Sequence, residues 1–193
     1  MEPLSDIAAQ KKSLRAACIA RRDAMDSGER SRRTSRLVDR LVALPQYRSA
    51  RSVLATMSIG SEWSTRGFLD RARSEGKSIV LPRVAKNPPR LEIHSVRDMD
   101  SDLVAGVWDI PEPDPARCPR VSLGDVDFAW VPALAVDAER YRLGYGAGYF
   151  DGLLAGRGEK PYCVCALPAE FHLAHVPHDS RDIPVDLTLS DAP

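Results

Sequence analysis

One stretch in the second half of the chain combines residue types that can bind phosphate and a metal. Residues 142–151 read Arg-Leu-Gly-Tyr-Gly-Ala-Gly-Tyr-Phe-Asp, with glycines alternating at positions 144, 146 and 148. Such glycines let backbone N–H groups approach a ligand, and a helix starting just after them adds unpaired first-turn N–H groups. Arg142 can clamp a phosphate, and Asp151 can hold magnesium. The stretch indicates a phosphate cradle with a metal carboxylate; the alternative is a glycine-rich turn between a strand and a helix.

Polar residues elsewhere are candidates for the same site, although each has a purely structural alternative. Lys11 and Arg15 share one face of a predicted helix, where they either form a solvated cationic surface, which the spacing alone favours, or point into a polyanion site. Glu62 follows a predicted strand and is either a helix cap or a ligand contact. Trp108 lies in a proline-rich loop, where it is a wall for a planar ligand or, more commonly, part of the core.

The elements that must position these residues alternate between strand and helix. Helices are expected at 4–25 and 30–44, the second with an N-cap at Ser27 or Ser31 and ended by Pro45. Thr65 is expected to cap a helix over 67–74, and Pro82 to close the strand before it. Strands are expected at 52–59, 77–81, 91–96, 127–134, 161–167 and 187–189. This order predicts a three-layer α/β domain with a mainly parallel sheet and ligands at the carboxyl ends of its strands.

Length and composition fit one soluble domain over residues 1–193, with residues 1–45 as a helical segment packed on the α/β core. The formal net charge is zero, and no long apolar run occurs, so we expect neither a membrane span nor a targeting segment at Met1–Pro3. The four cysteines lack metal-binding spacing, and a disulfide scaffold is not expected in a chain of this size. Cys163 and Cys165 stand in an apolar strand and are interpreted as buried thiols. We therefore expect a cytoplasmic protein that binds neither nucleic acid nor membrane.

Two further patterns are interpreted as structural. The helix at 30–44 is rich in arginine, but without interleaved aromatic residues a solvated helix is favoured over an RNA-binding one. His172, His175 and His178 are three apart, yet Pro177 interrupts a helix and no carboxylate stands at helical spacing, so a metal site is disfavoured. His94 falls on the polar face of its strand, and the prolines between 111 and 119 are expected to prevent regular structure.

Taken together, the motifs resemble the 5-formyltetrahydrofolate cyclo-ligase family over residues 11 to about 191. Residues 142–151 are similar to the family's Arg-Leu-Gly-x-Gly-x-Gly-Tyr-Tyr-Asp signature. Five weaker matches occur in the family's order: Lys11–Arg15, Glu62–Thr65, Val80–Arg83, Trp108–Pro113 and Asp182–Asp186. The resemblance implies a fold like that of NagB, RpiA and the CoA transferases.

The resemblance also implies an activity. ATP and Mg²⁺ would drive closure of 5-formyltetrahydrofolate to 5,10-methenyltetrahydrofolate, with release of ADP and phosphate. The formyl oxygen would attack the γ-phosphate, and the neighbouring folate nitrogen would then displace phosphate. No protein nucleophile is needed, so the protein positions substrates and stabilises charge, with Arg142 and Tyr149 as positioning residues.

The implied site has three groups of residues. Glu62, Trp108 and Tyr149 would contact the folate, and Asp151 and Asp182 would hold Mg²⁺. The ATP-binding group would be Lys11, Arg15, Arg142, Gly144, Tyr145, Gly146, Ala147, Gly148, Tyr149 and Phe150. The protein is expected to act as a monomer.

Several residues depart from the family pattern. Phe150 replaces a tyrosine, Tyr145 a frequent arginine, and Arg140 a frequent glycine. Ser64 and Phe171 stand near positions often held by an acidic residue and a glutamine. The alternative function is therefore a catalytically silent folate- or nucleotide-binding protein with the same fold.

Overall fold

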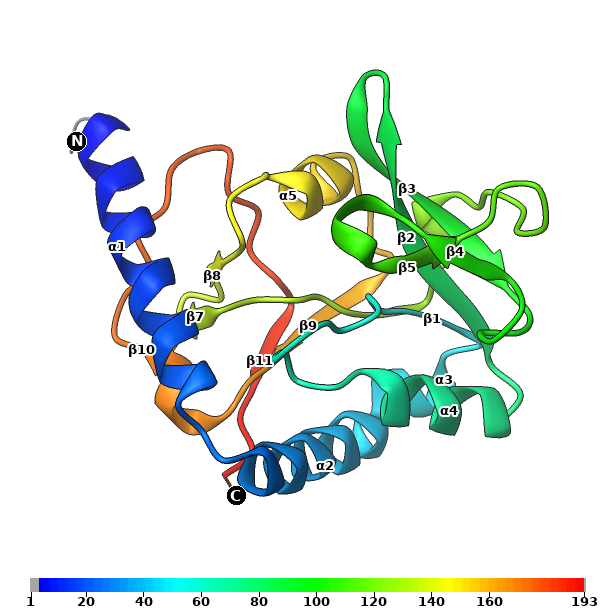
Figure 1. Ribbon diagram of the computed structural model, residues 1–193, viewed down its shortest axis with the longest axis horizontal. Coiled ribbons are helices and arrows are strands. Elements are labelled where there is room, and N and C mark those ends of the chain that lie inside the picture. The colour runs from blue at the N-terminus through cyan, green and yellow to red at the C-terminus, as the bar shows by residue number, and fades with distance from the viewer. Residues whose placement is uncertain (1–3, 193) are drawn as a thin grey trace.

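A six-stranded sheet forms the centre of the computed structural model, which describes residues 4–192 (Figure 1). Residues 1–3 and 193, and with them the expectation for Met1–Pro3, lie outside the described part. The strand order is β11-β9-β6-β1-β2-β3, and every neighbouring pair is parallel except β2 and β3. This confirms a mixed α/β fold with a mainly parallel sheet. The strands are β1 (Ser52–Leu54), β2 (Ser78–Lys86), β3 (Pro89–Val96), β6 (Phe128–Trp130), β9 (Tyr162–Ala166) and β11 (Leu187–Leu189).

The predicted strand–helix–strand unit is present. All three residues of β1 are buried, and helix α4 (Arg66–Ser74) follows it and leads into β2. Phe68 and Leu69 of α4 are fully buried, so the helix stays against the sheet while β1 and β2 pair in parallel. Thr65 precedes α4 but does not cap it with its side chain; its hydroxyl donates to the Thr56 carbonyl over 2.6 Å.

The expectation that Pro82 closes its strand is wrong. Strand β2 continues to Lys86 and forms a long antiparallel hairpin with β3, in which Pro82 faces Ile93. Strand β1 pairs with β2 only up to Val80 of β2. After Val80, β2 pairs with β3 on one side and no longer with β1 on the other. Proline is tolerated at an edge because no neighbouring strand needs its missing N–H.

The N-terminal helices differ in detail from the prediction. Helix α1 spans Leu4–Asp23 and α2 spans Ser27–Ala43. The N-cap of α2 is Asp26, whose carboxylate accepts from the Glu29 N–H, rather than Ser27 or Ser31. Pro45 ends α2 but also begins a further short helix, α3 (Pro45–Ser49), because its fixed φ suits a first helical position.

Helices lie on two sides of the central strands in Figure 1. The ribbons of α2, α3 and α4 run below the strands, whereas α5 (Tyr149–Leu154) lies above them and contacts β3. Helix α1 stands apart at the left, beside a small sheet of order β10-β7-β8. That sheet consists of β7 (Ala135–Asp137), β8 (Arg142–Leu143) and β10 (His172–Leu173).

Regular structure also occurs where prolines were expected to prevent it. Strands β4 (Leu103–Ala105) and β5 (Pro111–Pro113) pair in antiparallel fashion, joined by a 3-10 turn at Val107–Asp109. Further 3-10 turns occur at Leu123–Asp125 and Ala169–Phe171. A two-stranded ribbon has two free edges, so it accommodates proline where a central strand would not.

Two residues near this ribbon are placed differently from expectation. His94 is 4% exposed, with Nδ1 2.8 Å from the Cys118 carbonyl. It is covered because the chain folds back and pairs with β3 at Arg120. Trp108 is 67% exposed and has a φ of 56°, so it is not part of the core.

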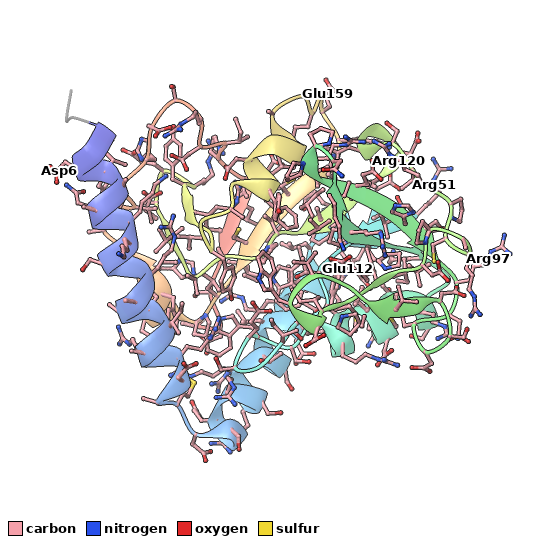
Figure 2. All side chains as sticks on the ribbon, turned by 45° about the horizontal axis from the view of Figure 1, so that its top comes forward. Asp6, Arg51, Arg97, Glu112, Arg120 and Glu159 are labelled. Carbon is pink, nitrogen blue, oxygen red and sulfur yellow. The ribbon has the colours of Figure 1, made fainter. Side chains whose placement is uncertain are left out.

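The interior is apolar, and long charged side chains project outward, as those of Asp6 and Arg97 do in Figure 2. All four cysteines are buried free thiols, which confirms the prediction made for Cys163 and Cys165. Burial raises the pKa of the Cys163 thiol to about 11. Within residues 4–192, each helix is too short or too polar to cross a membrane.

Candidate functional site

The glycine stretch forms an exposed loop between β8 and α5. Gly146 has a φ of 110°, and Gly148, with a φ of 70°, is the residue just before α5. Both values favour glycine, because a Cβ would strain the backbone there. Tyr145, before Gly146, and Ala147, between the two glycines, are both exposed. The loop therefore presents its backbone to solvent, as a phosphate cradle requires.

Helix α1 places a row of cations against this loop. Arg15 donates from Nε to the Gly144 carbonyl over 2.8 Å, and its guanidinium carbon would lie 3.4 Å from a Cβ at Gly146. Lys11, one turn earlier, points its ammonium group at Asp182. Arg15 thus contacts the loop and Lys11 pairs with a carboxylate, so neither cation lies on a free solvated face.

Arg142 and Asp151 form a buried ion pair beneath the loop. Arg142 Nη2 lies 2.7 Å from Asp151 Oδ1, and the Arg142 side chain is only 3% exposed. Its other terminal nitrogen donates to the Ile183 carbonyl, while the Ile183 N–H donates to the same Asp151 oxygen over 3.0 Å. Arg142 thus fixes the position of Asp151 and ties α5 to the segment that carries Asp182.

The two carboxylates predicted to bind metal therefore lie in linked segments. Asp182 precedes Ile183 directly; its oxygens accept from Lys11, and one also accepts from the Asp179 N–H over 2.7 Å. Both hydrogen bonds accepted by Asp151 fall on Oδ1, which leaves Oδ2 for a cation. Two carboxylates beside a glycine loop fit magnesium, which prefers oxygen ligands.

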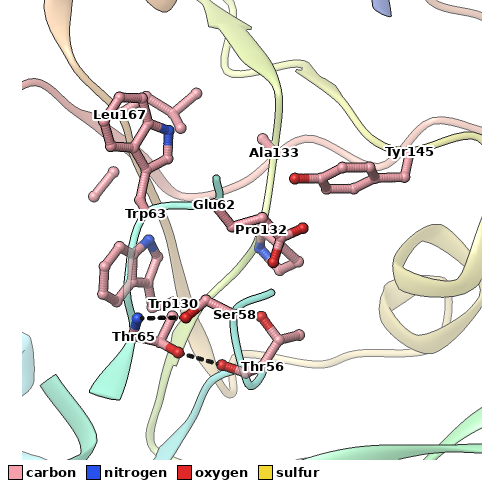
Figure 3. A pocket seen from close by; sticks show the side chains of 11 residues that line it. Thr56, Ser58, Glu62, Trp63, Thr65, Trp130, Pro132, Ala133, Tyr145 and Leu167 are labelled. Carbon is pink, nitrogen blue, oxygen red and sulfur yellow. Dashed lines mark hydrogen bonds between the residues drawn. The ribbon is translucent and has the colours of Figure 1, made fainter. Parts of the chain in front are cut away.

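A pocket next to the glycine loop contains Glu62. Its lining includes Thr56, Ser58, Glu62, Trp63, Trp130 and Tyr145 (Figure 3). Glu62 accepts from the Ile59 N–H through Oε2, so the carboxylate is oriented by its own turn. Glu62 also lines a larger hollow beside α2, together with Arg30 and Ser64. The first pocket offers an apolar wall and one carboxylate but only about 30 Å³ of free volume, whereas the hollow beside α2 has about 470 Å³. Only the hollow has the volume of a small-molecule site, and Glu62 lies where the two meet.

Tyr145 connects this pocket to the loop. Its hydroxyl points toward Glu62 and Ala133 in Figure 3 and accepts from Arg22 Nη1 over 2.7 Å. Desolvation of the hydroxyl and the nearby Glu62 carboxylate raise the pKa of Tyr145, so the phenol stays neutral at physiological pH. Arg22 also donates to the Ser61 hydroxyl over 2.9 Å and is 6% exposed.

The remaining predicted residues are placed less centrally. Tyr149 and Phe150 are half-buried in the first turn of α5, and Phe150 packs against the core. Trp108 lies on the β4–β5 connection and does not line the Glu62 pocket. Arg140 has a φ of 73°, a value typical of the glycine it replaces.

Comparison with known proteins decides the family. The model of the 5-formyltetrahydrofolate cyclo-ligase family matches residues 7–190. The chain belongs to the 5-formyltetrahydrofolate cyclo-ligase family. It is 31% identical to the 5-formyltetrahydrofolate cyclo-ligase of Mycolicibacterium smegmatis over 70% of this chain and 71% of that one. It is 28% identical to that of Mus musculus over 95% of both.

Solved structures of similar proteins support the fold of this cyclo-ligase family member. The 5,10-methenyltetrahydrofolate synthetase of Aquifex aeolicus superposes with a TM-score of 0.82 at 30% identity, covering 95% of this chain and 90% of that one. That of Mycoplasma pneumoniae gives a TM-score of 0.71 at 19% identity, covering 94% and 98%. The second likeness concerns the fold alone.

One residue that joins the two halves of the site was not among those predicted. Arg22 links the loop, through Tyr145, to the turn at Ser61. The sequence did contain a signal, because Arg22 is eleven residues after Lys11 and therefore on the same face of α1. Its partners lie 39 and 123 residues away, so its contacts could not be read from local spacing.

Proposed function

We propose that this protein is an ATP-dependent 5-formyltetrahydrofolate cyclo-ligase that forms 5,10-methenyltetrahydrofolate and releases ADP and phosphate. Family membership implies the ATP co-substrate. The observation that carries the proposal is an exposed glycine loop that Arg15 contacts and that the Arg142–Asp151 pair flanks, with Asp151 tied to Ile183, the residue after the Asp182 that pairs with Lys11. A triphosphate is bound by cations and by backbone N–H groups, and this region of the protein offers both.

The glycine loop is proposed to hold the phosphates. Backbone N–H groups of Gly144–Gly148 would contact the phosphate oxygens, with Arg15 alongside. Lys11 would leave Asp182 and bind the triphosphate when ATP arrives, which frees Asp182. Arg142 is buried and holds Asp151 in place. A direct contact between Arg142 and a phosphate remains a prediction from the sequence.

Magnesium is proposed to sit between Asp151, Asp182 and the nucleotide. When bound, it would neutralise the charge that develops on the β- and γ-phosphates. The protein's own contribution is to hold both carboxylates through Arg142 and the Ile183 backbone, so that little reorganisation is needed.

The folate is proposed to place its pteridine ring against Glu62, outside the small pocket and next to the larger hollow that Glu62 also lines. Glu62 would accept hydrogen bonds from the ring or formamide region, while Tyr149 and Trp108 would add aromatic contact area. The formyl oxygen would then face the γ-phosphate across the loop. Because the protein would hold both substrates in position to react with each other, the reaction needs no covalent intermediate on the protein.

We further propose a cytoplasmic monomer that does not bind nucleic acid or membrane. Its four free thiols fit a reducing compartment. Three arginines of α2 are paired with acids: Arg32 and Arg33 contact Glu29, Arg33 also contacts Glu170, and Arg36 lies 3.5 Å from Asp191.

The decisive experiment mixes purified protein with 5-formyltetrahydrofolate, ATP and Mg²⁺ and follows the absorbance of 5,10-methenyltetrahydrofolate. The absorbance of 5,10-methenyltetrahydrofolate is expected to increase, with one ADP formed for each molecule of product. Reactions without ATP or with a non-hydrolysable analogue are the controls. Tight binding of both ligands without turnover would support the catalytically silent alternative instead.

A further inference from the structure

A second cluster of potential ligands lies outside the residues assigned to ATP and folate. Asp137, Glu139, His175 and His178 each offer one ligand atom, and these atoms all lie within 4.8 Å of one another. Two of the residues come from the end of β7 and the turn after it, and two from the segment that follows β10. The sequence disfavoured a histidine metal site partly because no carboxylate stands at helical spacing from the histidines. In the fold, the carboxylates of Asp137 and Glu139 lie beside His175 and His178.

Asp137 holds the two segments together without using all its acceptor capacity. It is 1% exposed, and it accepts from the Tyr141 N–H over 3.0 Å and from the Val176 N–H over 2.8 Å, one on each oxygen. Each carboxylate oxygen has two lone pairs, so one on each oxygen is free of these bonds. The cluster therefore rests on a fixed backbone arrangement rather than on chance proximity of surface side chains.

His178 is oriented as a metal ligand would be. Its Nδ1 lies 2.9 Å from the Val176 carbonyl, which can only accept, so Nδ1 carries the proton and Nε2 keeps its lone pair. Histidines that bind metals commonly donate their other ring nitrogen to a carbonyl or carboxylate in this way. The ring also stacks on Tyr141, with centroids 3.5 Å apart and an interplanar angle of 7°.

His175 completes the group from the solvent side. Its Nδ1 is 3.9 Å from Asp137 Oδ2, and its ring centroid is 5.4 Å from that of His178. The side chain is 62% exposed, and Glu139 is also exposed, so an ion can enter from solvent. One ligand is thus buried, one is half-buried and two can close over an arriving cation.

We propose that Asp137, Glu139, His175 and His178 bind a divalent transition metal of the zinc class. Two imidazoles and two carboxylates form a mixed N/O set that suits a four-coordinate zinc ion, whereas magnesium prefers oxygen ligands throughout. The ion would join residues 137–139 to residues 175–178, close in sequence to Arg142 on one side and Asp182 on the other. It would therefore stiffen the frame of the ATP-binding region without entering the reaction.

The test is zinc binding to the full-length protein, measured by calorimetry and by thermal unfolding in buffer that contains excess Mg²⁺. The expected result is one zinc ion per chain and a higher Tm. His178→Gln and His175→Gln should each weaken binding by at least about tenfold. His172→Gln is the matched control, because His172 lies three residues before His175, has its Nε2 near the Leu167 and Leu189 carbonyls and is outside the cluster.

Cobalt provides a second readout that does not depend on stability or activity. Tetrahedral Co²⁺ in the cluster should give visible absorption bands without thiolate charge transfer, and the bands should disappear in His178→Gln but persist in His172→Gln. The proposal is overturned if wild-type protein binds no zinc beside Mg²⁺. It is equally overturned if the three variants bind zinc alike, or if the cobalt spectrum shows thiolate ligands.

Discussion

Lys11 in α1 and Asp182 near the C-terminus form an ion pair across 171 positions of the chain, with Nζ 2.6 and 2.7 Å from the two carboxylate oxygens. Both side chains are largely buried, at 14% and 16% exposure. In the proposed site one of these residues would bind the triphosphate and the other the magnesium ion. Their pairing keeps both charges satisfied before the nucleotide arrives and joins α1 to the segment that carries Asp182.

Lys11→Gln should therefore weaken ATP use more than folate use. The change removes a charge-assisted hydrogen bond to phosphate, worth about 1.5–3 kcal/mol, so kcat/KM for ATP should fall roughly tenfold to a hundredfold. Steady-state kinetics with each substrate varied in turn measures the difference. Lys12→Gln, at the exposed neighbouring position, is the control. A larger effect on folate than on ATP would contradict the assignment.

The glycine loop could be located from sequence because its signal is local: alternating glycines need only their own neighbours to be recognised. The pairing of Lys11 with Asp182 could not, because periodicity shows which residues share a helix face but not what that face meets. The same limit applies to Arg22 and to the Asp137–His178 cluster, which are assembled by the fold from distant segments.

Asp151→Asn should abolish most turnover and also reduce stability. The amide oxygen can still accept from Arg142, but the negative charge that balances a buried guanidinium is lost. We expect turnover to fall by about a hundredfold or more, from loss of a magnesium ligand, and the free energy of unfolding to fall by about 1–3 kcal/mol. Magnesium-dependent kinetics and denaturant unfolding measure the two effects separately.

The control for that variant is an exposed ion pair. Asp70→Asn removes one of the two acidic partners of Arg66; the Asp70 and Arg66 side chains are 50% and 43% exposed. Exposed pairs contribute about 0–1 kcal/mol, so Asp70→Asn should change neither turnover nor stability much. Normal activity in Asp151→Asn would refute the metal role.

The parallel strands were predictable because short apolar runs alternated with a helical pattern. The β2–β3 hairpin was not, because whether Pro82 ends a strand depends on whether β1 still runs beside it, which is a property of the sheet rather than of the residue. His94 likewise became buried only because residues near Arg120 return over β3.

Gly146→Ala should impair ATP binding through the backbone. With a φ of 110°, the backbone of an alanine would be strained by about 1–3 kcal/mol, while its Cβ would only touch the Arg15 guanidinium at ordinary van der Waals distance. We expect a higher KM for ATP and a lower Tm, measured by kinetics and calorimetry. Gly158→Ala, in the loop after α5 and with open space around its Cβ position, should leave both near wild type. Unchanged ATP kinetics in Gly146→Ala would argue against a backbone cradle.

Trp108→Ala tests whether an exposed tryptophan serves the folate. The side chain is 67% exposed, so its removal should change the free energy of unfolding by no more than about 0.5 kcal/mol. The left-handed backbone at position 108 is equally unfavourable for tryptophan and alanine, so the variant reports the effect of losing the indole ring alone. If the ring stacks on the pteridine, a loss of about 0.5–1.5 kcal/mol should raise the KM for 5-formyltetrahydrofolate roughly twofold to tenfold, with the KM for ATP unchanged. Val104→Ala on β4, also exposed, is the control. A lower Tm with unchanged folate kinetics would instead assign Trp108 to the stability of the β4–β5 ribbon.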